Sequence, residues 1–280
     1  MTVQTPIRPQ APAAGAAAPP APRIPQGVNW IGLQTLYLRE VRRFWKVGAQ
    51  TVAGPVVTTL LYMMIFAVAT SGGRPPLEGV PFAVFVGPGL IMMGIMNNAF
   101  ANSSSSLFQA KINNTAPDFL CPPLTPMELT VGFSAGAMTR GFLVGVVTAA
   151  AVWPFSHFGL AHLWAVVYFA TAAALIMSTT GVLAALWAQK FDELASVTSF
   201  VVTPLTFLSG TFYLVERLPE PFRTASHANP FFYLIDGFRY GFIGKAEGSL
   251  ALGVVYSALL SAALVWAVWR MFTTGWRLKS

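Results

Sequence analysis

The sequence offers few residues that could carry out chemistry, and they are not arranged as a catalytic or metal site. Its 280 residues include 17 Lys and Arg, 10 Asp and Glu, three His and one Cys. Cys121 stands alone, and His157, His162 and His227 lie among apolar residues without a nearby carboxylate pair. There is no H-E-x-x-H or G-x-S-x-G pattern, and "GKAEG" at Gly244 lacks the residues of a phosphate-binding loop. We therefore expect no enzymatic activity, metal or cofactor in this chain.

The densest charge lies in "NWIGLQTLYLREVRRFWK", within residues 28–46. Its apolar residues recur at the spacing of one helix face, and charged residues occupy the remainder. The apolar face comprises Trp30, Leu33, Tyr37, Val41 and Phe44, and the charged remainder includes Arg39, Glu40, Arg42 and Arg43. This pattern predicts an amphipathic helix in the membrane interface, with its basic side toward anionic headgroups. The helix is either a positively charged anchor or a platform for a cytosolic partner.

A second candidate binding element lies in "KINNTAPDFLCPPL". It combines an acid, apolar side chains and two prolines in one short segment: Asp118, Phe119, Leu120, Pro122, Pro123 and Leu124. A stiff and partly apolar element is unusual in contact with water. We therefore predict that this loop is a docking surface on the inner side of a membrane.

The following stretch, "LTPMELT", predicts the start of a long helix. Thr125 can cap it, Pro126 suits its first position, and Glu128 completes a capping box. Arg140 then lies about fifteen residues into the helix, at a depth where an arginine must snorkel, pair or face a polar cavity. On the same helix, two G-x-x-x-G pairs permit close helix packing, either within one subunit or between subunits. They are Gly132 with Gly136 and Gly141 with Gly145.

A stretch near the end of the chain, "HANPFFYLIDGFRYGFIG", is too polar at both ends to span a membrane and too apolar for a wet loop. Asn229, Pro230, Asp236 and Arg239 do not suit bare hydrocarbon, but irregular backbone is tolerated at depth where protein buries it. We predict short re-entrant helices on the outer face, with Asp236 and Arg239 close enough to pair. A plain outer loop is the alternative.

Composition indicates what must position these residues. The chain is 55% hydrophobic and 10% charged, with a mean hydropathy of +0.60, whereas soluble domains have about 25% charged residues. Apolar stretches with few charges leave room for six crossings of a bilayer. The predicted crossings are residues 51–70, 80–101, 127–153, 163–187, 194–214 and 249–270. The fold class is thus all-α integral membrane, with a transmembrane domain over residues 47–275 and a disordered, Ala/Pro-rich cytoplasmic tail over residues 1–27.

The basic residues indicate the orientation of these crossings. If the N-terminus is cytoplasmic, twelve of the 17 Lys and Arg residues fall on inner segments and five on outer ones. This excess predicts that both termini lie on the inner side. The net charge of +7 then reflects membrane orientation rather than binding to nucleic acid, which we do not expect as a partner.

Three classes of function remain open from composition and spacing. The six predicted crossings contain no Asp and one Glu, the capping residue Glu128 at the start of the third, so a secondary transporter coupled to protons or sodium is weakly supported. The second class is the membrane subunit of an ATP-driven machine, whose energy would come from elsewhere and enter through the inner loops. A membrane scaffold without transport activity is the remaining class.

Five stretches, in this order, resemble the ABC-2 type permease family, the membrane subunits of bacterial ATP-binding-cassette exporters. They are "EVRRFWKVGAQTVAGPVVTTLLYMMIF", "PGLIMMGIMNNAFAN", "LCPPLTPMELTVG", "TPLTFLSGTFYLVERLP" and "NPFFYLIDGFRYGFIG". The resemblance covers about residues 30–275 and is closest to small permeases for drugs, lipids or polysaccharides. Two departures are Ala67, where relatives often have Gly, and Leu214, where they often have Pro.

The resemblance implies an assembly in the bacterial inner membrane. Two permease chains would pair with each other and with two copies of an ABC ATPase, which would supply the hydrolysis. The amphipathic helix would be the connecting helix against the ATPase, and Asp118–Leu124 the coupling helix. ATP-driven motion would then pass from these elements to the crossings, and a path along the dimer interface would open outward or into the lipid.

Overall fold

The computed structural model describes residues 27–70 and 80–277, and every element in these ranges is helical. Apart from Gly27, the predicted tail lies outside the described residues. The elements in chain order are α1 (Trp30–Trp45), α2 (Gly48–Thr70), α3 (Phe82–Ile112), α4 (Pro117–Leu120), α5 (Pro126–Ser156), α6 (Leu163–Trp187), α7 (Phe191–Val197), the π-helical turn η1 (Thr198–Val202), α8 (Thr203–Phe207), the 3-10 turn η2 (Val215–Arg217), α9 (Phe222–Ala228), α10 (Pro230–Ile243) and α11 (Leu250–Thr274).

Long apolar helices dominate the architecture. Within the described ranges, five helices are long and apolar enough to cross a membrane: α2, α3, α5, α6 and α11. This confirms the predicted all-α integral membrane fold. The helix α3 continues to Ile112, well beyond the predicted crossing at residues 80–101. At 31 residues each, α3 and α5 measure about 46 Å, so they extend past a hydrocarbon core of about 30 Å.

The predicted crossing at residues 194–214 is a broken element rather than one long helix. The helices α7 and α8 follow one another through the wider turn η1, and the helical path ends at Phe207. Pro204 lies in the first turn of α8, two residues after η1, and Gly210 adopts a positive φ of 75° that favours glycine. The helical part is shorter than the roughly 20 residues that a crossing needs. The total of six crossings therefore stays a prediction.

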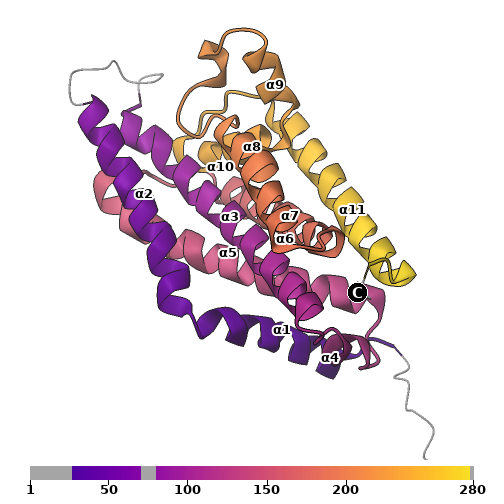
Figure 1. Cartoon of the computed structure of the whole chain (residues 1–280). Helices are drawn as coiled ribbons and strands as arrows, with labels where there is room; N and C mark the ends of the chain where they lie inside the picture. Colours follow the sequence, from indigo (N-terminus) through magenta and orange to yellow (C-terminus); the bar gives the residue numbers. More distant parts are fainter. Residues whose placement is uncertain (1–26, 71–79, 278–280) are drawn as a thin grey trace, which may run out of the picture.

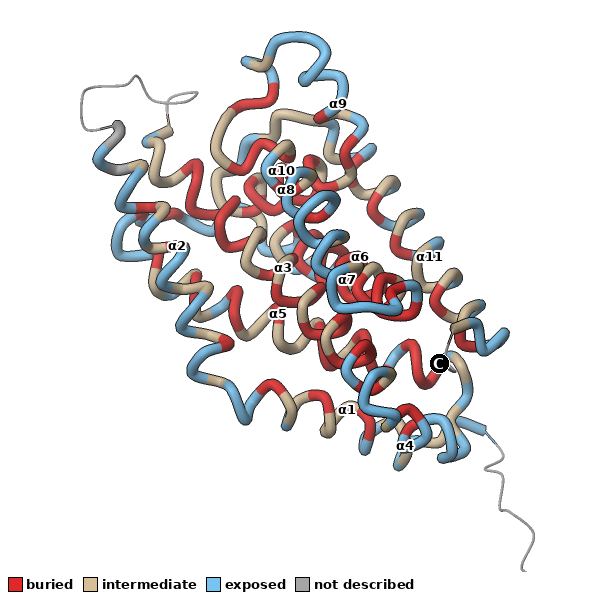
Figure 2. The backbone as a smooth tube through the Cα atoms, viewed as in Figure 1, coloured by how far each residue is buried: buried red, intermediate tan, exposed pale blue. Residues whose placement is uncertain are grey.

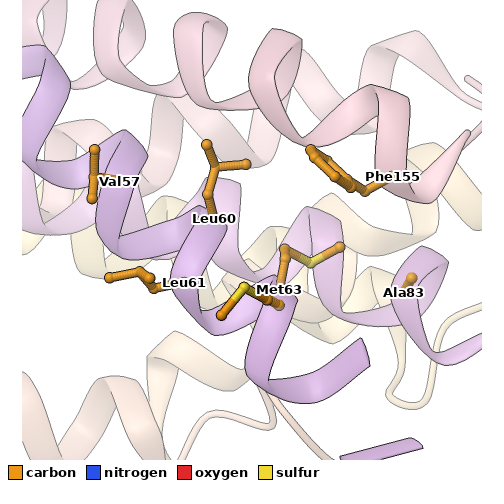
Figure 3. Close-up of a pocket in the computed structure, with 7 residues that line it drawn as sticks. Val57, Leu60, Leu61, Met63, Ala83 and Phe155 are labelled. Carbon is orange, nitrogen blue, oxygen red and sulfur yellow. The ribbon is translucent and has the colours of Figure 1, made fainter. Parts of the chain in front are cut away.

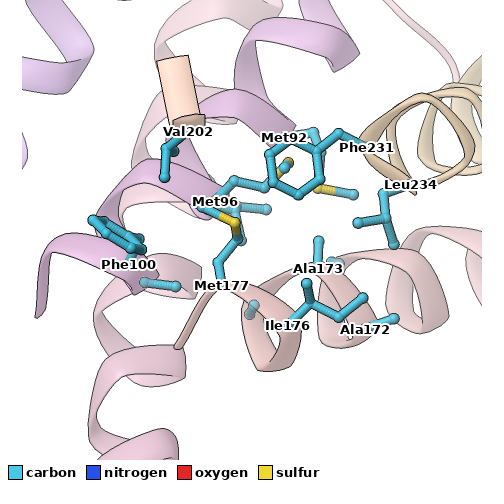
Figure 4. Close-up of a cluster of buried hydrophobic side chains, with 14 of the residues drawn as sticks. Met92, Met96, Phe100, Ala172, Ala173, Ile176, Met177, Val202, Phe231 and Leu234 are labelled. Atoms are coloured by element: carbon cyan, nitrogen blue, oxygen red, sulfur yellow. The ribbon is translucent and has the colours of Figure 1, made fainter. Parts of the chain in front are cut away.

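The helices α3 and α6 form the centre of the bundle. Their most apolar windows are 67% and 78% buried, against 17% for α2 and 22% for α11. Side chains from these two helices meet others from η1 and α10 in one apolar cluster, with Met92, Met96, Ile176, Met177 and Phe231 among its members (Figure 4). The packing is close because many of the facing residues of α6 are alanine.

Apolar side chains on the outer helices are exposed in the isolated chain. Figure 2 shows long exposed stretches along α2, along α7 with α8, and along α11. Examples are Leu61, Phe200, Leu259 and Trp266, each at least half exposed. Since an exposed apolar surface of this extent is unusual in water, these faces must contact lipid or another protein.

The helix α5 begins as predicted and ends later than predicted. Thr125 and Glu128 form the complete capping box, with Pro126 in the first turn. At the other end the helix continues through Pro154 to Ser156, and His157 closes it in a left-handed conformation with φ of 45°. A proline in the last turn removes one backbone donor without breaking the helix there.

Both G-x-x-x-G pairs of α5 are filled by helices of the same chain. Leu36 of α1 packs against Gly132, and Glu40 packs against Gly136. Farther along α5, a Cβ atom on Gly141 would lie 2.9 Å from the carbonyl oxygen of Ile95 in α3. The sequence left a subunit interface as the alternative, but these glycines serve packing within the chain.

Non-spanning helices lie at the two ends of the bundle (Figure 1). The helices α1 and α4 lie at one end, which we call the α1 end. The helices α9 and α10 lie at the other, which we call the α10 end. The candidate functional residues predicted from the sequence divide between these two ends, except for Arg140, which lies midway along α5.

Candidate functional site

Helix α1 packs against the bundle along a face centred on Leu36, Glu40 and Phe44, all buried. This face differs from the predicted one, because Trp30 is 71% exposed. The shift has a physical cause: Gly132 and Gly136 leave room for α1 opposite Leu36 and Glu40. The predicted amphipathic helix is present, but its buried stripe includes a carboxylate.

The start of α1 and the loop after α4 are tied together by one side chain. The Oε1 atom of Glu128 accepts a hydrogen bond from the backbone N–H of Asn29 at 2.5 Å, and its Oε2 atom accepts one from the N–H of Thr125 at 2.6 Å. The side-chain amide of Asn29 also donates to the carbonyl of Pro123 at 3.2 Å. Glu128 therefore caps two helices at once. We call α1, α4, the loop to Thr125 and the first turn of α5 the α1–α4 platform.

Phe119 anchors α4 to the bundle from within the platform. It is 2% exposed and meets Phe133 of α5 edge to face, with ring centroids 5.2 Å apart. The guanidinium of Arg39 lies 5.6 Å from the Phe119 ring centroid, within the range of a cation–π contact. Of the other predicted docking residues, Leu124 is partly buried, while Asp118, Leu120, Pro122 and Pro123 are exposed. These four residues form the outward surface of the platform, together with Arg42 of α1.

Glu40 and Arg43, predicted as partner-facing residues, face the bundle instead. The Ser106 hydroxyl donates to Glu40 Oε1 at 2.7 Å, and Arg43 Nε lies 3.5 Å from Glu40 Oε2. One Arg43 Nη atom donates to the backbone carbonyl of Asn102 at 2.8 Å and to its side-chain oxygen at 2.9 Å. Burial excludes Glu40 from a surface contact in this conformation, so it can act on a partner only through the position of α1.

Arg140 belongs to the same polar region. One of its Nη atoms donates to the side-chain oxygen of Asn98 at 3.3 Å. Asn98 and Asn102 are one turn apart on α3, so a line of polar side chains connects α1, α3 and α5. We call Glu40, Arg43, Asn98, Asn102 and Arg140 the polar cluster. The sequence left three possibilities for Arg140: it snorkels, pairs or faces a polar cavity. The structure gives it the Asn98 side chain as a hydrogen-bond partner.

A second buried ionic group holds α10 in place. Arg239 is 3% exposed, lies 3.1 Å from a carboxylate oxygen of Glu247 and donates to the carbonyl of Gly210 at 2.7 Å. Its guanidinium also lies 3.8 Å from the centroid of Phe85 in α3. Asp236 accepts from the backbone N–H groups of Glu247 and Gly248, both at 2.9 Å. We call Asp236, Arg239 and Glu247 the α10 lock.

The other two residues predicted in this stretch form the start of α10. The Asn229 side chain accepts from the N–H of Phe231 at 3.0 Å and donates to the carbonyl of Leu205 in α8 at 2.6 Å. Pro230 occupies the first helical position, where its missing N–H costs nothing. Asn229 therefore starts one helix and holds the end of another.

Several site residues were not identified from the sequence. Asn29 and Glu247 lie in loops or at helix ends and were given no role, while Glu128 was predicted only as a cap. Asn98 and Asn102 carry a signal that could have found them, because two amides one turn apart in an apolar helix indicate a polar contact. No comparable signal links Arg239 to Glu247, which depends on how the loop after α10 folds back.

Comparison with known proteins assigns this arrangement to a family. The family model described as ABC-2 type transporter matches residues 32–243. The chain is 33% identical over 252 residues to the inner membrane transport permease YadH of Escherichia coli (strain K12), covering 90% of this chain and 98% of the relative. It is 26% identical over 254 residues to nodulation protein J of Sinorhizobium fredii (strain NBRC 101917 / NGR234), covering 87% of this chain and 90% of that relative.

Proposed function

The chain belongs to the ABC-2 type transporter family, and we propose that it is the membrane subunit of an ATP-driven exporter. It is a membrane transport component of several apolar helices. In the proposal, two copies form the export path and two copies of a separate ABC ATPase bind below them. The name of the Escherichia coli relative supports a place in the bacterial inner membrane.

The observation that carries this proposal is the construction of the α1–α4 platform. Its outward surface offers an acid and apolar groups, Asp118, Leu120 and Pro122, which suit a groove on a soluble partner. Its inward side is continuous with α5 through Phe119 and Glu128. A displacement applied to α4 would therefore reach α1 and α5 together, as coupling to an ATPase requires.

Grooves on the lipid-facing surface favour an amphipathic or lipid-like cargo. A cavity of about 450 Å³ lies beside α2, between it, α3 and the far end of α5 (Figure 3). Its lining is apolar: Val57, Leu60, Leu61, Met63, Met64, Ala83 and Phe155. Such a groove can take an alkyl chain from the bilayer but offers no polar group to a sugar or a nucleotide.

The proposed orientation can be tested with the native cysteine. Cys121 is the single cysteine of the chain and is exposed directly after α4. A membrane-impermeant maleimide is expected to label it in inverted membrane vesicles and to leave it unlabelled in intact spheroplasts. The Cys121→Ser variant gives the background. Labelling from the outer side would place α4 away from any cytosolic ATPase and would overturn the proposal.

Coupling can be tested with two exposed substitutions. Vesicles containing the chain and a candidate ABC ATPase are loaded with a fluorescent lysophospholipid, and its movement is followed with ATP or a non-hydrolysable analogue. Leu120→Asp and Asp118→Lys are expected to lower ATP-dependent movement about tenfold. The first would bury a carboxylate in place of an apolar contact with the ATPase, and the second would reverse the charge that faces the ATPase. Glu216→Lys, an equally exposed change at the α10 end, is the matched control.

The outcomes separate the classes left open by the sequence. Movement that needs hydrolysable ATP and is lost in both platform variants supports the proposal. Movement without ATP indicates a secondary transporter, and no movement under any condition indicates a scaffold. Membrane insertion and melting temperature should stay unchanged in all variants, because the substituted side chains are exposed.

A further inference from the structure

Arg140 is partly buried, and its charge has fewer described partners than the charges of Arg239 and Lys111. Arg239 has the Glu247 carboxylate, a carbonyl and an aromatic ring. Lys111 donates to the carbonyls of Leu186 and Ala188 at 2.9 and 2.7 Å, at the end of α6. These partners compensate the cost of removing each charge from water.

Arg140 has only a neutral amide as a described partner. Its hydrogen bond to Asn98 is long, at 3.3 Å, and its buried Nε atom has no hydrogen-bond acceptor among the residues that the structure describes. The carboxylate of the polar cluster, Glu40, lies 3.5 Å from Arg43 and balances that residue. The polar cluster thus contains two guanidinium groups and one carboxylate, a formal net charge of about +1.

Asn98 connects this charge to an open groove. A cavity of about 230 Å³ lies between α2 and α3, and Asn98 is part of its wall. The other polar groups of the wall are Thr58, Thr59, Tyr62 and Asn97. The Asn98 amide nitrogen donates one hydrogen bond to the carbonyl of Gly94 at 3.0 Å and has a second N–H, while its oxygen accepts from the Arg140 guanidinium at 3.3 Å.

We propose that the groove between α2 and α3 binds the anionic group of the transported molecule, with Arg140 supplying the positive charge and Asn98 the contact. The proposal rests on the transport function proposed above. A phosphate or carboxylate fits the chemistry, because the Asn98 amide and the hydroxyl groups of the wall can donate hydrogen bonds to its oxygens while the nearby Arg140 charge stabilises it. An anion here would supply the charge balance that the described residues lack.

The neighbouring surface defines the rest of the ligand. The groove also has an apolar wall, formed by Pro55, Leu90 and Met93. An amphiphile with one anionic headgroup therefore matches this region better than a small inorganic ion. The inferred cargo class is an anionic, lipid-like molecule, in which the headgroup meets the polar wall and the chain stays in apolar surroundings.

Binding can be measured on the purified full chain in a neutral maltoside detergent, without an ATPase. The probes are lauroyl lysophosphatidic acid, laurate, neutral monolaurin and inorganic phosphate, and the readout is the concentration dependence of the melting temperature. Wild-type protein is expected to bind the two anionic amphiphiles at least tenfold more tightly than monolaurin. Inorganic phosphate distinguishes the source of the anion: weak competition supports a headgroup, and strong competition supports a free anion.

Substitution of Arg140 gives the decisive comparison. Arg140→Gln should lose about tenfold in affinity for the anionic probes and bind monolaurin as before, while Arg140→Lys keeps most of the preference. Arg217→Gln, which removes an exposed arginine, is the matched control. Equal preference for anions in wild type and Arg140→Gln would overturn the inference, as would a wild-type protein without preference. If Arg140→Gln does not fold, the wild-type probes and Arg140→Lys still decide.

The two proposals can fail separately. Anion binding that depends on Arg140, combined with no ATP-dependent movement, would leave the site in place and remove its assignment to cargo. ATP-dependent movement of neutral and anionic amphiphiles at the same rate, together with no anion preference in binding, would leave the transport function and remove the site.

Discussion

The two ends of the bundle hold their non-spanning helices in different ways. At the α1 end, the α1–α4 platform is joined to α5 by backbone capping, by a buried phenylalanine and by glycines that allow close approach. Both ends also hold a charged pair: at the α1 end Glu40 is buried but its partner Arg43 is 28% exposed, whereas at the α10 end Arg239 and Glu247 are 3% and 5% exposed. The α1 end is therefore held mainly by capping and packing contacts near the surface, and the α10 end by an ion pair inside the bundle.

This difference indicates which end can move at low cost. Asn29 and Thr125 lie at partly or fully exposed positions, so their N–H groups can exchange the capping hydrogen bonds for bonds to water, and each bond contributes about 1 kcal/mol. A buried ion pair cannot be opened without exposing both charges to an apolar interior, which costs several times more. We therefore expect the α1–α4 platform to shift as one body while α10 stays fixed to α3, α8 and α11.

The largest effect that would test this comparison is the removal of Arg239. Arg239→Met leaves the Glu247 carboxylate buried without this cation, and we expect a loss of about 3–5 kcal/mol in the free energy of unfolding. The measurement is thermal or denaturant unfolding of the purified protein in detergent. Arg223→Met, at an exposed position nearby, should change stability by less than about 0.5 kcal/mol.

A double substitution sharpens this prediction. Combining Arg239→Met with Glu247→Gln removes both charges. The glutamine keeps an oxygen that can accept the hydrogen bond that Val215 N–H donates to Glu247 at 2.8 Å. Part of the lost stability should return, because the buried Glu247 charge is then removed together with that of Arg239. A double variant less stable than Arg239→Met alone would show that the ion pair is not what holds α10.

An intermediate effect is expected from filling one glycine at the α1 end. A Cβ atom on Gly136 would lie 2.5 Å from the Glu40 Cβ atom, so Gly136→Ala must push α1 away from α5. The expected cost is about 1–3 kcal/mol, and hydrogen exchange should rise in α1 while α10 stays protected. Gly54→Ala, where nothing lies within 4 Å of the added carbon, should be neutral or stabilising. Equal exchange in α1 and α10 would contradict the separation of the two ends.

The smallest effect concerns the shared cap. Glu128→Ala removes the acceptor of the Asn29 and Thr125 backbone N–H groups and should cost about 1–2 kcal/mol. The increase in hydrogen exchange should appear in residues 29–33 as well as in the first turn of α5. Glu216→Ala serves as the control for loss of one surface carboxylate. A response confined to α5 would show that α1 is held by its packing alone.

The sequence predicted the elements governed by local patterns and missed those governed by distant contacts. The spacing of apolar residues located α1, and the capping box located the start of α5, because both signals lie within a few residues. The exposed part of Asp118–Leu124 was also predicted from its composition. The fifth crossing was predicted to end at Leu214, but the helical path ends at Phe207. The apolar pattern of the sequence continues past this point, while the backbone turns at Gly210.

The predicted site residues show the same division. Arg239 was expected to be close enough to pair with Asp236, which stays a prediction, whereas its contact with Glu247, eight positions away in a loop, was not expected. Glu40 was expected at the surface because it lies among arginines, and a spacing argument cannot show that Ser106 and Gly136 receive it. The partners of buried charged side chains therefore could not be predicted from the spacing of residues in the sequence.

The bond between Asn29 and Glu128 joins residues 99 positions apart, which has a consequence for biosynthesis. A ribosome adding about 5–20 residues per second makes α1 roughly 5–20 s before the carboxylate that fixes its first turn. During that interval the helix has no docking groove, since Gly132 and Gly136 are also still to come. The newly made segment must rest on the lipid surface, where Trp30 and its basic residues are suited to hold it.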